Sequence, residues 1–319
     1  MTETIRARAQ ALLPELAAIR RDFHRFAELG WMEMRTTSLL ARRLTDLGYE
    51  VLTGPAVCKA DARMGLPSAD TLEAHYKWAQ ENGADPEFLP VTRGGFTGVI
   101  ATLHCGEGPT VALRFDIDAL GVLEASDETH LPHREGFASV TPGVMHACGH
   151  DGHAAVGIGT AMLLRELRGQ LHGTVRLIFQ PAEEGVRGAS SVVAAGHLDG
   201  ADYALAAHVF PAGKAAGLVD IGVLKENGQG GLATSKLDVT FRGRSAHAGI
   251  APQEGRNALL AAATAVLNLH AIPRFGSTPT QLNVGTLHAG TGRNVICETA
   301  KLELEVRGQT TEANEYMLR

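Results

Sequence analysis

The chain has 319 residues, of which 20% are charged and 45% hydrophobic, and this length and composition are typical of a globular protein with up to two domains. The formal net charge of -6 and the absence of a basic cluster argue against a nucleic-acid-binding protein. The N-terminal residues lack the apolar core of a signal peptide, and no apolar stretch is long enough to span a membrane.

The four cysteines of the chain show no paired spacing. They are Cys58, Cys105, Cys148 and Cys297. Isolated cysteines are typical of free thiols in a reducing compartment, so we expect a cytoplasmic protein without disulfides.

Residues 1–230 alternate between helical and strand patterns, which predicts an α/β domain with helices layered on a mixed sheet. Gly48 is the stop signal of the second helix. A long polar insertion between Cys58 and Gly95 contains the third helix, and a fourth follows His150. The earlier helices are predicted over residues 12–26, 36–47 and 68–82, and the strands over residues 49–52, 99–103, 110–115, 175–179 and 203–210.

Residues 231–319 predict a smaller α+β domain of ferredoxin-like type, with its helices on one face of the sheet. The first strand alternates apolar and polar side chains, as half-buried strands do. The final helix has no stop signal before Arg319, so we expect a truncated chain. The predicted elements are strand 234–241, helix 254–269, strands 281–287 and 298–306, and a helix from residue 311.

The segment HACGHDGH, residues 146–153, contains three histidines and one cysteine directly after a turn at residues 141–143. Cys148 and His150 are separated by one residue and can point at a common centre. A thiolate and an imidazole suit a divalent ion such as Zn²⁺ or Mn²⁺. The alternative interpretation is a histidine-rich turn beside a buried cysteine.

Two apolar strands are followed by further ligand-type side chains. The run VRLIF leads to the adjacent carboxylates of Glu183 and Glu184, which are costly to bury unless they bind a cation or shift their pKa. The run beginning YALAA leads to His208. Because open α/β sheets place their sites at strand ends, we expect these side chains to meet Cys148 and His150 there.

Taken together, these motifs resemble the metal-dependent amidohydrolase and exopeptidase superfamily, in the branch of the hippurate and indole-acetyl-amino-acid hydrolases. The resemblance covers essentially the whole chain. It implies a catalytic domain at residues 1–230 and a lid or dimerisation domain at residues 231–319, with the last metal ligand and the end of the catalytic domain absent from this chain. The motifs are RRDFHRFAELGW, RMGLP with the insertion after it, GGFTG, DIDAL, HACGHDGH, FQPAEEG, SAHAG with GRNALLAA, and GRNVI.

The resemblance implies two divalent metal ions, Mn²⁺ or Zn²⁺, bridged by Cys148, with His150, Glu184 and His208 as further ligands. Glu183 would then be the general base that takes a proton from water and passes it to the departing amine. The reverse assignment of the two glutamates remains open.

Two aspartates and two histidines near the ligands have supporting roles in this interpretation. Asp116 and Asp118 follow a predicted strand, and Asp118 is the expected partner that orients a ligating imidazole. The alternative is that both aspartates cap the following turn. His146 and His153 are expected to be packing or supporting groups.

In the predicted lid, the resemblance singles out His247 in SAHAG. Relatives extend the matching histidine across a dimer interface into the partner's site, where it stabilises the oxyanion. Asn294 and Arg307 are expected to contact the substrate, with Arg307 binding its α-carboxylate in a bidentate way. Arg293 is a weaker candidate, and the alternative for Arg307 is an exposed strand-end residue. Cys297 stands where relatives usually have proline, which is expected to loosen that turn.

The expected activity is hydrolysis of an N-acyl-glutamate, p-aminobenzoyl-glutamate, by a homodimer or by a heterodimer with a homologous B-type subunit. An N-acyl-amino-acid or hippurate-type hydrolase is the alternative within the same chemistry. A metal-free thiol hydrolase with Cys148 as nucleophile would leave the paired glutamates without a role. A non-catalytic assembly subunit or an inactive fragment is the last alternative, because the final metal ligand is expected to be absent. No nucleic-acid or membrane partner is expected.

Overall fold

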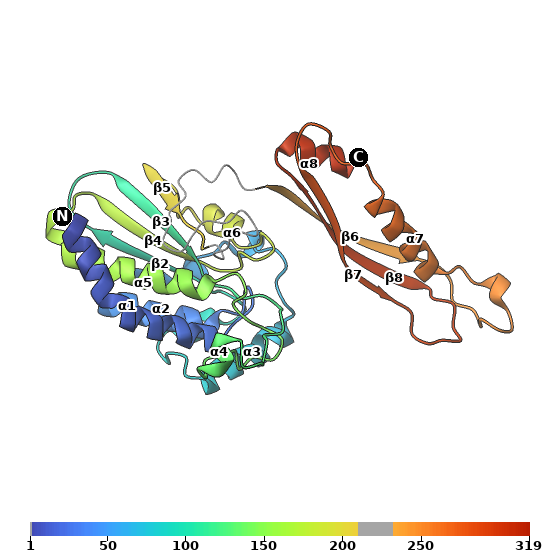
Figure 1. Ribbon diagram of the computed structural model, residues 1–319, viewed down its shortest axis with the longest axis horizontal. Coiled ribbons are helices and arrows are strands. Elements are labelled where there is room, and N and C mark those ends of the chain that lie inside the picture. Colours follow the sequence, from blue (N-terminus) through green and yellow to red (C-terminus); the bar gives the residue numbers. More distant parts are fainter. Residues whose placement is uncertain (1, 210–231) are drawn as a thin grey trace. The chain divides into compact units, whose positions relative to one another are not determined.

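The computed structural model describes residues 2–209 and residues 232–319, and each of these segments forms a unit with its own hydrophobic core (Figure 1). The boundary predicted between residues 230 and 231 lies outside the described residues. The α/β fold class, with a second and smaller unit, is confirmed.

The first unit is built on a five-stranded mixed sheet with the strand order β1-β2-β4-β3-β5. Strands β3, β4 and β5 are parallel, whereas β1 and β2 run antiparallel to their neighbours. The carboxyl ends of the three parallel strands therefore lie at one edge of the sheet. The strands are β1 (Glu50–Thr53), β2 (Val99–His104), β3 (Thr110–Asp116), β4 (Thr174–Gln180) and β5 (Tyr203–Ala206).

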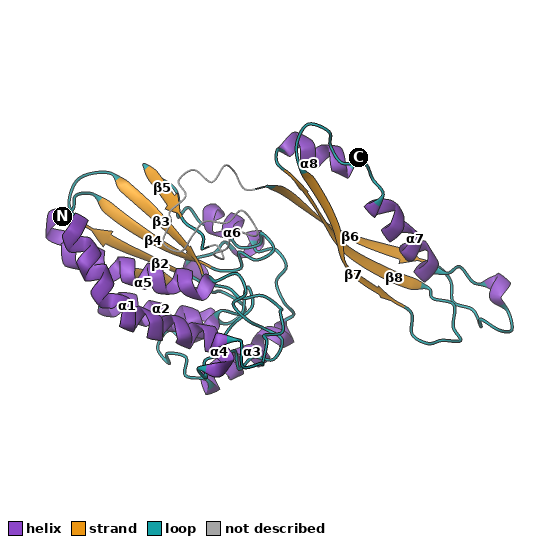
Figure 2. Cartoon of the chain, viewed as in Figure 1, coloured by secondary structure: helices purple, strands orange, loops and turns teal. Residues whose placement is uncertain are grey.

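Helices cover both faces of this sheet because the side chains of the central strands alternate between two cores. Leu177 and Phe179 of β4 belong to the larger core, which α1 (Thr2–Arg25), α2 (Met34–Asp46) and α5 (His150–Leu167) cover (Figure 2). Ile178 faces the other way, into a smaller core that includes Val192 of α6 (Ala189–Ala194).

Local signals define the ends of the helices. Gly48 has a φ of 78°, a left-handed conformation that favours glycine, and its N–H bonds the carbonyl of Thr45 at the end of α2. Ser68 caps the predicted helix of the insertion, α3 (Ala69–Glu81), by accepting a hydrogen bond from the backbone N–H of Thr71. The short helices α6 and α4 (Leu131–Arg134) did not stand out from the sequence pattern.

Strand β5 is shorter than predicted. It ends at Ala206 rather than continuing toward residue 210, and its side chains are exposed, including Tyr203 at 62% and Leu205 at 61%. The reason is its position at the edge of the sheet, where β3 is its one neighbour among the described strands.

The second unit has the predicted order of elements and a three-stranded antiparallel sheet, β6-β8-β7. Leu302, Leu304 and Val306 of β8 face a core that both helices cover. The first helix begins four residues later than predicted, because Asn257 caps it and residues Pro252–Glu254 form a separate 3-10 turn. The elements are β6 (Ala233–Arg242), α7 (Ala258–His270), β7 (Thr280–Ala289), β8 (Thr299–Gly308) and α8 (Thr311–Leu318).

The lengths and apolar content of the described helices bear on whether the chain could span a membrane. None of them is both long and apolar enough to cross a bilayer.

Candidate metal centre

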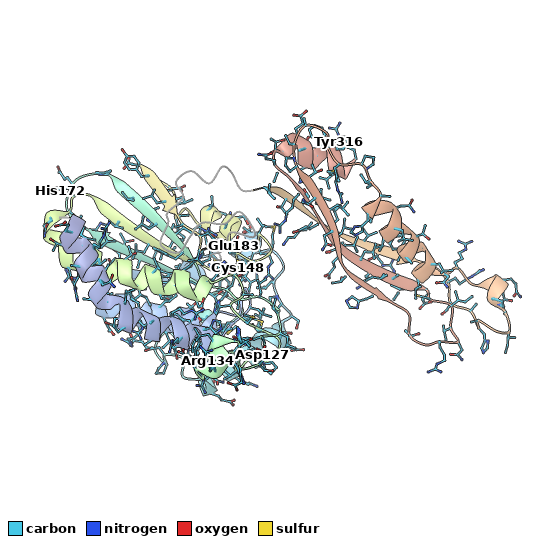
Figure 3. The ribbon with its side chains drawn as sticks, in the orientation of Figure 1. Asp127, Arg134, Cys148, His172, Glu183 and Tyr316 are labelled. Carbon is cyan, nitrogen blue, oxygen red and sulfur yellow. The ribbon has the colours of Figure 1, made fainter. Side chains whose placement is uncertain are left out.

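Ligand-type side chains gather at the carboxyl ends of the three parallel strands. Asp116 ends β3, the paired glutamates follow β4, and His208 follows β5. Cys148 lies on the loop that leads into α5, and Figure 3 shows it close to Glu183. The convergence expected from the strand pattern is therefore present within one unit.

Cys148, His150 and His208 form one group of possible ligands, with donor atoms that all lie within 4.8 Å of one another. Sγ of Cys148 is 3.4 Å from Nε2 of His208. Gly149 between the first two has a φ of 80°, and a Cβ atom there would lie 2.6 Å from Val209. Glycine is therefore required at the point where the loop becomes helix α5.

In both histidines of this group, Nε2 is the ring nitrogen left for a metal, because Nδ1 is held by a backbone carbonyl. Nδ1 of His150 lies 3.0 Å from the carbonyl oxygen of Asp118, and Nδ1 of His208 lies 2.6 Å from that of Val209. A carbonyl can only accept, so Nδ1 carries the proton in both rings and Nε2 carries the lone pair. A neutral imidazole with its other nitrogen held in this way is the usual arrangement of a metal ligand.

His150, Glu183 and Glu184 form a second group within the same 4.8 Å limit. Nε2 of His150 is 3.9 Å from Oε2 of Glu183, which is too far for a hydrogen bond. Nε2 of His150 and Oε1 of Glu184 are both buried without a hydrogen-bond partner among the described residues. Buried polar atoms without partners are costly, and a divalent cation would satisfy both. The residues present therefore fit the predicted metal.

Asp118 connects the two groups. Its side chain is fully buried, Oδ1 lies 3.2 Å from Nδ1 of His150, and Oδ2 accepts a hydrogen bond of 2.8 Å from the backbone N–H of Glu184. Burial lowers the pKa of His150, but the hydrogen bond to Asp118 and the nearby carboxylates outweigh it and raise that pKa. This geometry favours the orienting role over a simple turn cap.

Asp116 supports a different histidine. Its carboxylate pairs with Arg114 and lies 3.4 Å from Nδ1 of His153. Nε2 of the same ring accepts a hydrogen bond of 3.0 Å from the backbone N–H of Val209. His153 therefore holds the segment that carries His208, which is a supporting contact of the kind expected as one of its two alternatives.

His146, the other flanking histidine, is buried, and neither ring nitrogen has a hydrogen-bond partner among the described residues. Burial lowers its pKa to about 4, so the ring is neutral at physiological pH. This position is consistent with packing.

Residues 181–188, which carry Glu183 and Glu184 and are called the glutamate loop from here on, are held by a buried carboxylate that the sequence pattern did not single out. Glu33 accepts hydrogen bonds of 2.7 Å from the backbone N–H of Ala182 and from the hydroxyl of Thr97. The non-glycine residues with positive φ in the described chain are Ala182, Val186 and Trp31, and the first two lie in the glutamate loop itself. Strained backbone of this kind gathers at functional sites. Burial and the charge of Asp118 raise the pKa of Glu33 to about 8.

The surroundings of Cys148 bear on the thiol-nucleophile alternative. Burial and the neighbouring carboxylates, chiefly Glu184, raise the pKa of Cys148 to about 12. A nucleophilic cysteine needs the opposite environment, one that stabilises the thiolate at neutral pH. The anionic surroundings instead suit a thiolate that forms together with a bound cation.

His247 lies in the second unit, where its loop pairs with the loop that precedes β8. The backbone N–H groups of Gly249 and Ile250 both donate to Nδ1 of His247 at 3.2 Å. Nδ1 is thus an acceptor, so the neutral ring carries its proton on Nε2. The exposed side of this histidine is a hydrogen-bond donor, as the stabilisation of an oxyanion requires.

Asn294 lies beside His247, whereas Arg307 does not. The backbone N–H of Ala248 donates to the carbonyl of Asn294 at 3.0 Å. Arg307 is near the other end of β8, roughly 26 Å along the strand from Thr299 at about 3.3 Å per residue, whereas Asn294 precedes the strand. Its guanidinium is half-exposed and pairs with Glu305 at 2.7 Å.

Cys297 and Arg293 occupy the same loop region of the second unit. The carbonyl of Cys297 accepts a hydrogen bond of 2.8 Å from Ala258, and its thiol lies 3.1 Å from the carbonyl of Thr299. The turn expected to be loosened by cysteine is held by both bonds. Arg293 lines a neighbouring cavity of about 490 Å³.

Comparisons with known proteins agree with this geometry. A model of Peptidase family M20/M25/M40 matches residues 112–312. The chain is 49% identical over 307 residues to an indole-3-acetyl-aspartic acid hydrolase of Enterobacter agglomerans, covering 96% of this chain and 69% of the relative. It is 46% identical over 316 residues to a p-aminobenzoyl-glutamate hydrolase subunit of Escherichia coli, covering 99% of this chain and 71% of the relative.

Two solved structures are also similar to this chain. An aminobenzoyl-glutamate utilization protein from Klebsiella pneumoniae matches with a TM-score of 0.74 and 42% identity, over 97% of this chain and 70% of that chain. A dinuclear metal binding peptidase of the M20 family from Bacillus subtilis matches with a TM-score of 0.57 and 32% identity, over 97% of this chain and 68% of that chain.

Proposed function

This chain belongs to Peptidase family M20/M25/M40 and is a metal-dependent amidohydrolase, and we propose that it cleaves p-aminobenzoyl-glutamate to p-aminobenzoate and glutamate. One observation carries the proposal: at the carboxyl ends of the parallel strands, Cys148, His150 and His208 form one group of possible ligands, and His150 also belongs to a second group with Glu183 and Glu184. The substrate assignment is supported by the likeness to the Escherichia coli p-aminobenzoyl-glutamate hydrolase over 99% of the chain.

We propose two divalent ions, Mn²⁺ or Zn²⁺, held by Cys148, His150, Glu184 and His208, with Cys148 as the bridge. The donor set of thiolate, imidazole and carboxylate suits either metal. The matching Bacillus subtilis structure is described as a dinuclear metal binding peptidase, which supports the number. When bound, such ions polarise the amide carbonyl and lower the pKa of water.

Glu183 is the proposed general base. Its side chain is 33% exposed, so it is open to water on one side while Nε2 of His150 lies 3.9 Å away on the other. Glu184 is more enclosed: burial raises its pKa, and its Oε1 atom has no hydrogen-bond partner among the described residues. The enclosed carboxylate suits a cation, and the open one can take a proton from water and return it to the leaving nitrogen.

The second unit is the proposed lid and dimerisation domain. His247, whose Nε2–H has no acceptor among the described residues, would donate to the oxyanion of the transition state, and Asn294 and Arg307 would contact the substrate. Strand β8 separates Asn294 from Arg307. We therefore propose that a single lid does not supply both of these residues to the same active site. A partner lid, from a second copy or from a homologous B-type subunit, would complete it. The Escherichia coli relative is named as one subunit of its hydrolase, which supports a partner.

A role in the breakdown of folate-derived compounds, in a reducing cytoplasm, belongs to the same proposal. The free state of all four cysteines supports the compartment.

The test is a substrate panel with metal-loaded protein. Release of p-aminobenzoate from p-aminobenzoyl-glutamate is expected, with kcat/KM at least ten-fold above that for hippurate and acetyl-amino acids. Indole-3-acetyl-aspartate is the strongest competing substrate, because a hydrolase named for it is 49% identical to this chain. Preference for that compound would leave the reaction class unchanged but would change both the acyl group and the amino acid of the proposed substrate. Hydrolysis of none of these amides would contradict the proposed function.

A further inference from the structure

Arg187 joins the glutamate loop to the polar insertion near residue 65. Its Nε atom donates to the carbonyl of Glu184 at 2.8 Å, and a terminal nitrogen donates to the carbonyl of Gly65 at 3.3 Å. The guanidinium is therefore fixed in position by the backbone of two segments that are far apart in the sequence. One of these segments carries the proposed general base and a proposed metal ligand.

The backbone around Arg187 is shaped to hold its side chain. A Cβ atom on Gly30 would lie 2.6 Å from a terminal nitrogen of Arg187, and one on Gly65 would lie 2.7 Å from its Cδ. Gly65 also has a φ of 63°, and the preceding residue Val186 has a φ of 56°. Two glycines thus make room for this arginine, and a strained residue directs the chain into it.

The charge of Arg187 is not neutralised within the described part of the chain, since no carboxylate oxygen there lies within 4.0 Å of its guanidinium. The side chain has five N–H groups, and the two backbone carbonyls occupy two of them. An arginine that is positioned by carbonyls and keeps three donors and its full charge is arranged to bind an anion.

We propose that Arg187 binds the side-chain carboxylate of the amino-acid part of the substrate and thereby selects acidic over neutral amino acids. This inference rests on the proposed function, because p-aminobenzoyl-glutamate carries both of its carboxylates on the glutamate. Arg307 is the residue proposed for the α-carboxylate, so the second carboxylate requires a second cation. A guanidinium fork matches a carboxylate in two parallel hydrogen bonds, which an amide cannot reproduce.

The experiment compares p-aminobenzoyl-glutamate, p-aminobenzoyl-glutamine and the α-amide of p-aminobenzoyl-glutamate as substrates of wild type, Arg187→Gln and Arg187→Lys. Arg165→Gln is the matched control, because Arg165 also donates Nε to a backbone carbonyl, that of Leu47 at 2.8 Å, but lies near the end of α5 remote from His150. Binding of free glutamate and free glutamine to the metal-loaded proteins is measured in parallel by calorimetry, which needs no turnover.

The expected result is a wild-type preference for glutamate over glutamine of about 100-fold in kcat/KM, falling to within a few-fold in Arg187→Gln and partly recovered in Arg187→Lys. Relative to p-aminobenzoyl-glutamate, the α-amide should have a kcat/KM that is lower by the same factor in wild type and in Arg187→Gln. Arg165→Gln should keep the wild-type preference for glutamate over glutamine. The inference would be overturned if Arg187→Gln left the glutamate-to-glutamine ratio of kcat/KM unchanged. It would also be overturned if the variant lost only the discrimination against the α-amide.

The calorimetric arm separates this inference from the proposed function. In one outcome no amide is cleaved, but glutamate binds at least ten-fold more tightly than glutamine and only Arg187→Gln abolishes this difference. The proposed function is then wrong, whereas the carboxylate subsite at Arg187 stands. If cleavage occurs and the variant leaves both ratios unchanged, the function stands and the subsite is wrong.

Discussion

Asp118 and His150 face each other in the interior, with Oδ1 of the aspartate 3.2 Å from Nδ1 of the histidine and both side chains fully buried. The contact fixes the tautomer that leaves Nε2 of His150 free for a metal. We predict that Asp118→Asn lowers metal affinity by about ten- to a hundred-fold, because the charge that supports the imidazole is lost. Competition with a chelating dye measures the change.

Asp127→Asn is the control for that substitution. Asp127 is exposed and accepts a hydrogen bond of 2.9 Å from the backbone N–H of Thr129, so it tests the loss of one carboxylate away from the site. Equal metal affinity of Asp118→Asn and wild type would contradict the orienting role.

Metal binding is predicted to release a proton from Cys148. Because burial and nearby carboxylates raise the pKa of this thiol to about 12, it is protonated at pH 8 until a cation binds. Calorimetry in buffers of different ionisation enthalpy counts the released protons. Cys148→Ser should release about one proton fewer than wild type. If the two proteins release the same number, Cys148 is not a thiolate ligand.

The aromatic ring at position 153 offers a way to separate packing from hydrogen bonding. His153→Phe retains ring contact with His208, whose centroid is 4.6 Å away, but cannot accept the hydrogen bond from Val209. We predict a ten-fold or larger loss of metal affinity. The free energy of unfolding of the metal-free protein should fall by about 1–3 kcal/mol, since the hydrogen bond from Val209 and the contact with the buried carboxylate of Asp116 are both lost.

The exposed His104, changed to Phe, controls for the substitution itself. Metal affinity within two-fold of wild type in His153→Phe would show that the ring is only a packing group.

The raised pKa of Glu33 leads to a prediction for how the free energy of unfolding of the metal-free protein depends on pH. Its pKa rises from an ordinary value of 4.5 to about 8 in the folded state. Between these values the folded protein holds the proton that the unfolded chain releases, so the free energy of unfolding falls as pH rises through this window and levels off above it. Urea unfolding from pH 4 to 9 in the presence of chelator measures the slope.

Glu33→Gln cannot ionise and should lose this component of the slope while keeping an acceptor for the N–H of Ala182. An identical slope in the variant would show that Glu33 is already ionised in the folded protein at neutral pH.

Much of the fold follows from the sequence because the central strands are buried on both faces. The runs at β2 and β4 are mostly apolar, with Thr102 and Arg176 as the polar residues within them, and they form strands whose ends differ from prediction by at most one residue. Parallel strands place their carboxyl ends together, which is why Glu184 and His208, at positions distant in sequence, could be expected at one centre. The end of β5 was less predictable, since an apolar edge strand has no change of pattern where its pairing stops.

Other features depend on contacts that no local pattern contains. Glu33 bonds the N–H of Ala182, 149 residues away, and nothing in the segment around Glu33 indicates that partner. Arg187 follows the glutamate motif closely, but only the three-dimensional structure shows that no carboxylate among the described residues pairs with it.

The most direct test of the account is release of p-aminobenzoate by Glu183→Gln and Glu184→Gln, with the metal content of each protein measured on the same sample. We predict that Glu183→Gln keeps close to two ions per chain while kcat falls by about 10²–10⁴-fold, as expected for loss of a general base. Glu184→Gln should lose metal together with activity. If Glu183→Gln loses its metal and Glu184→Gln keeps it, the two roles are reversed; if Glu183→Gln retains both metal and full activity, Glu183 is not the base.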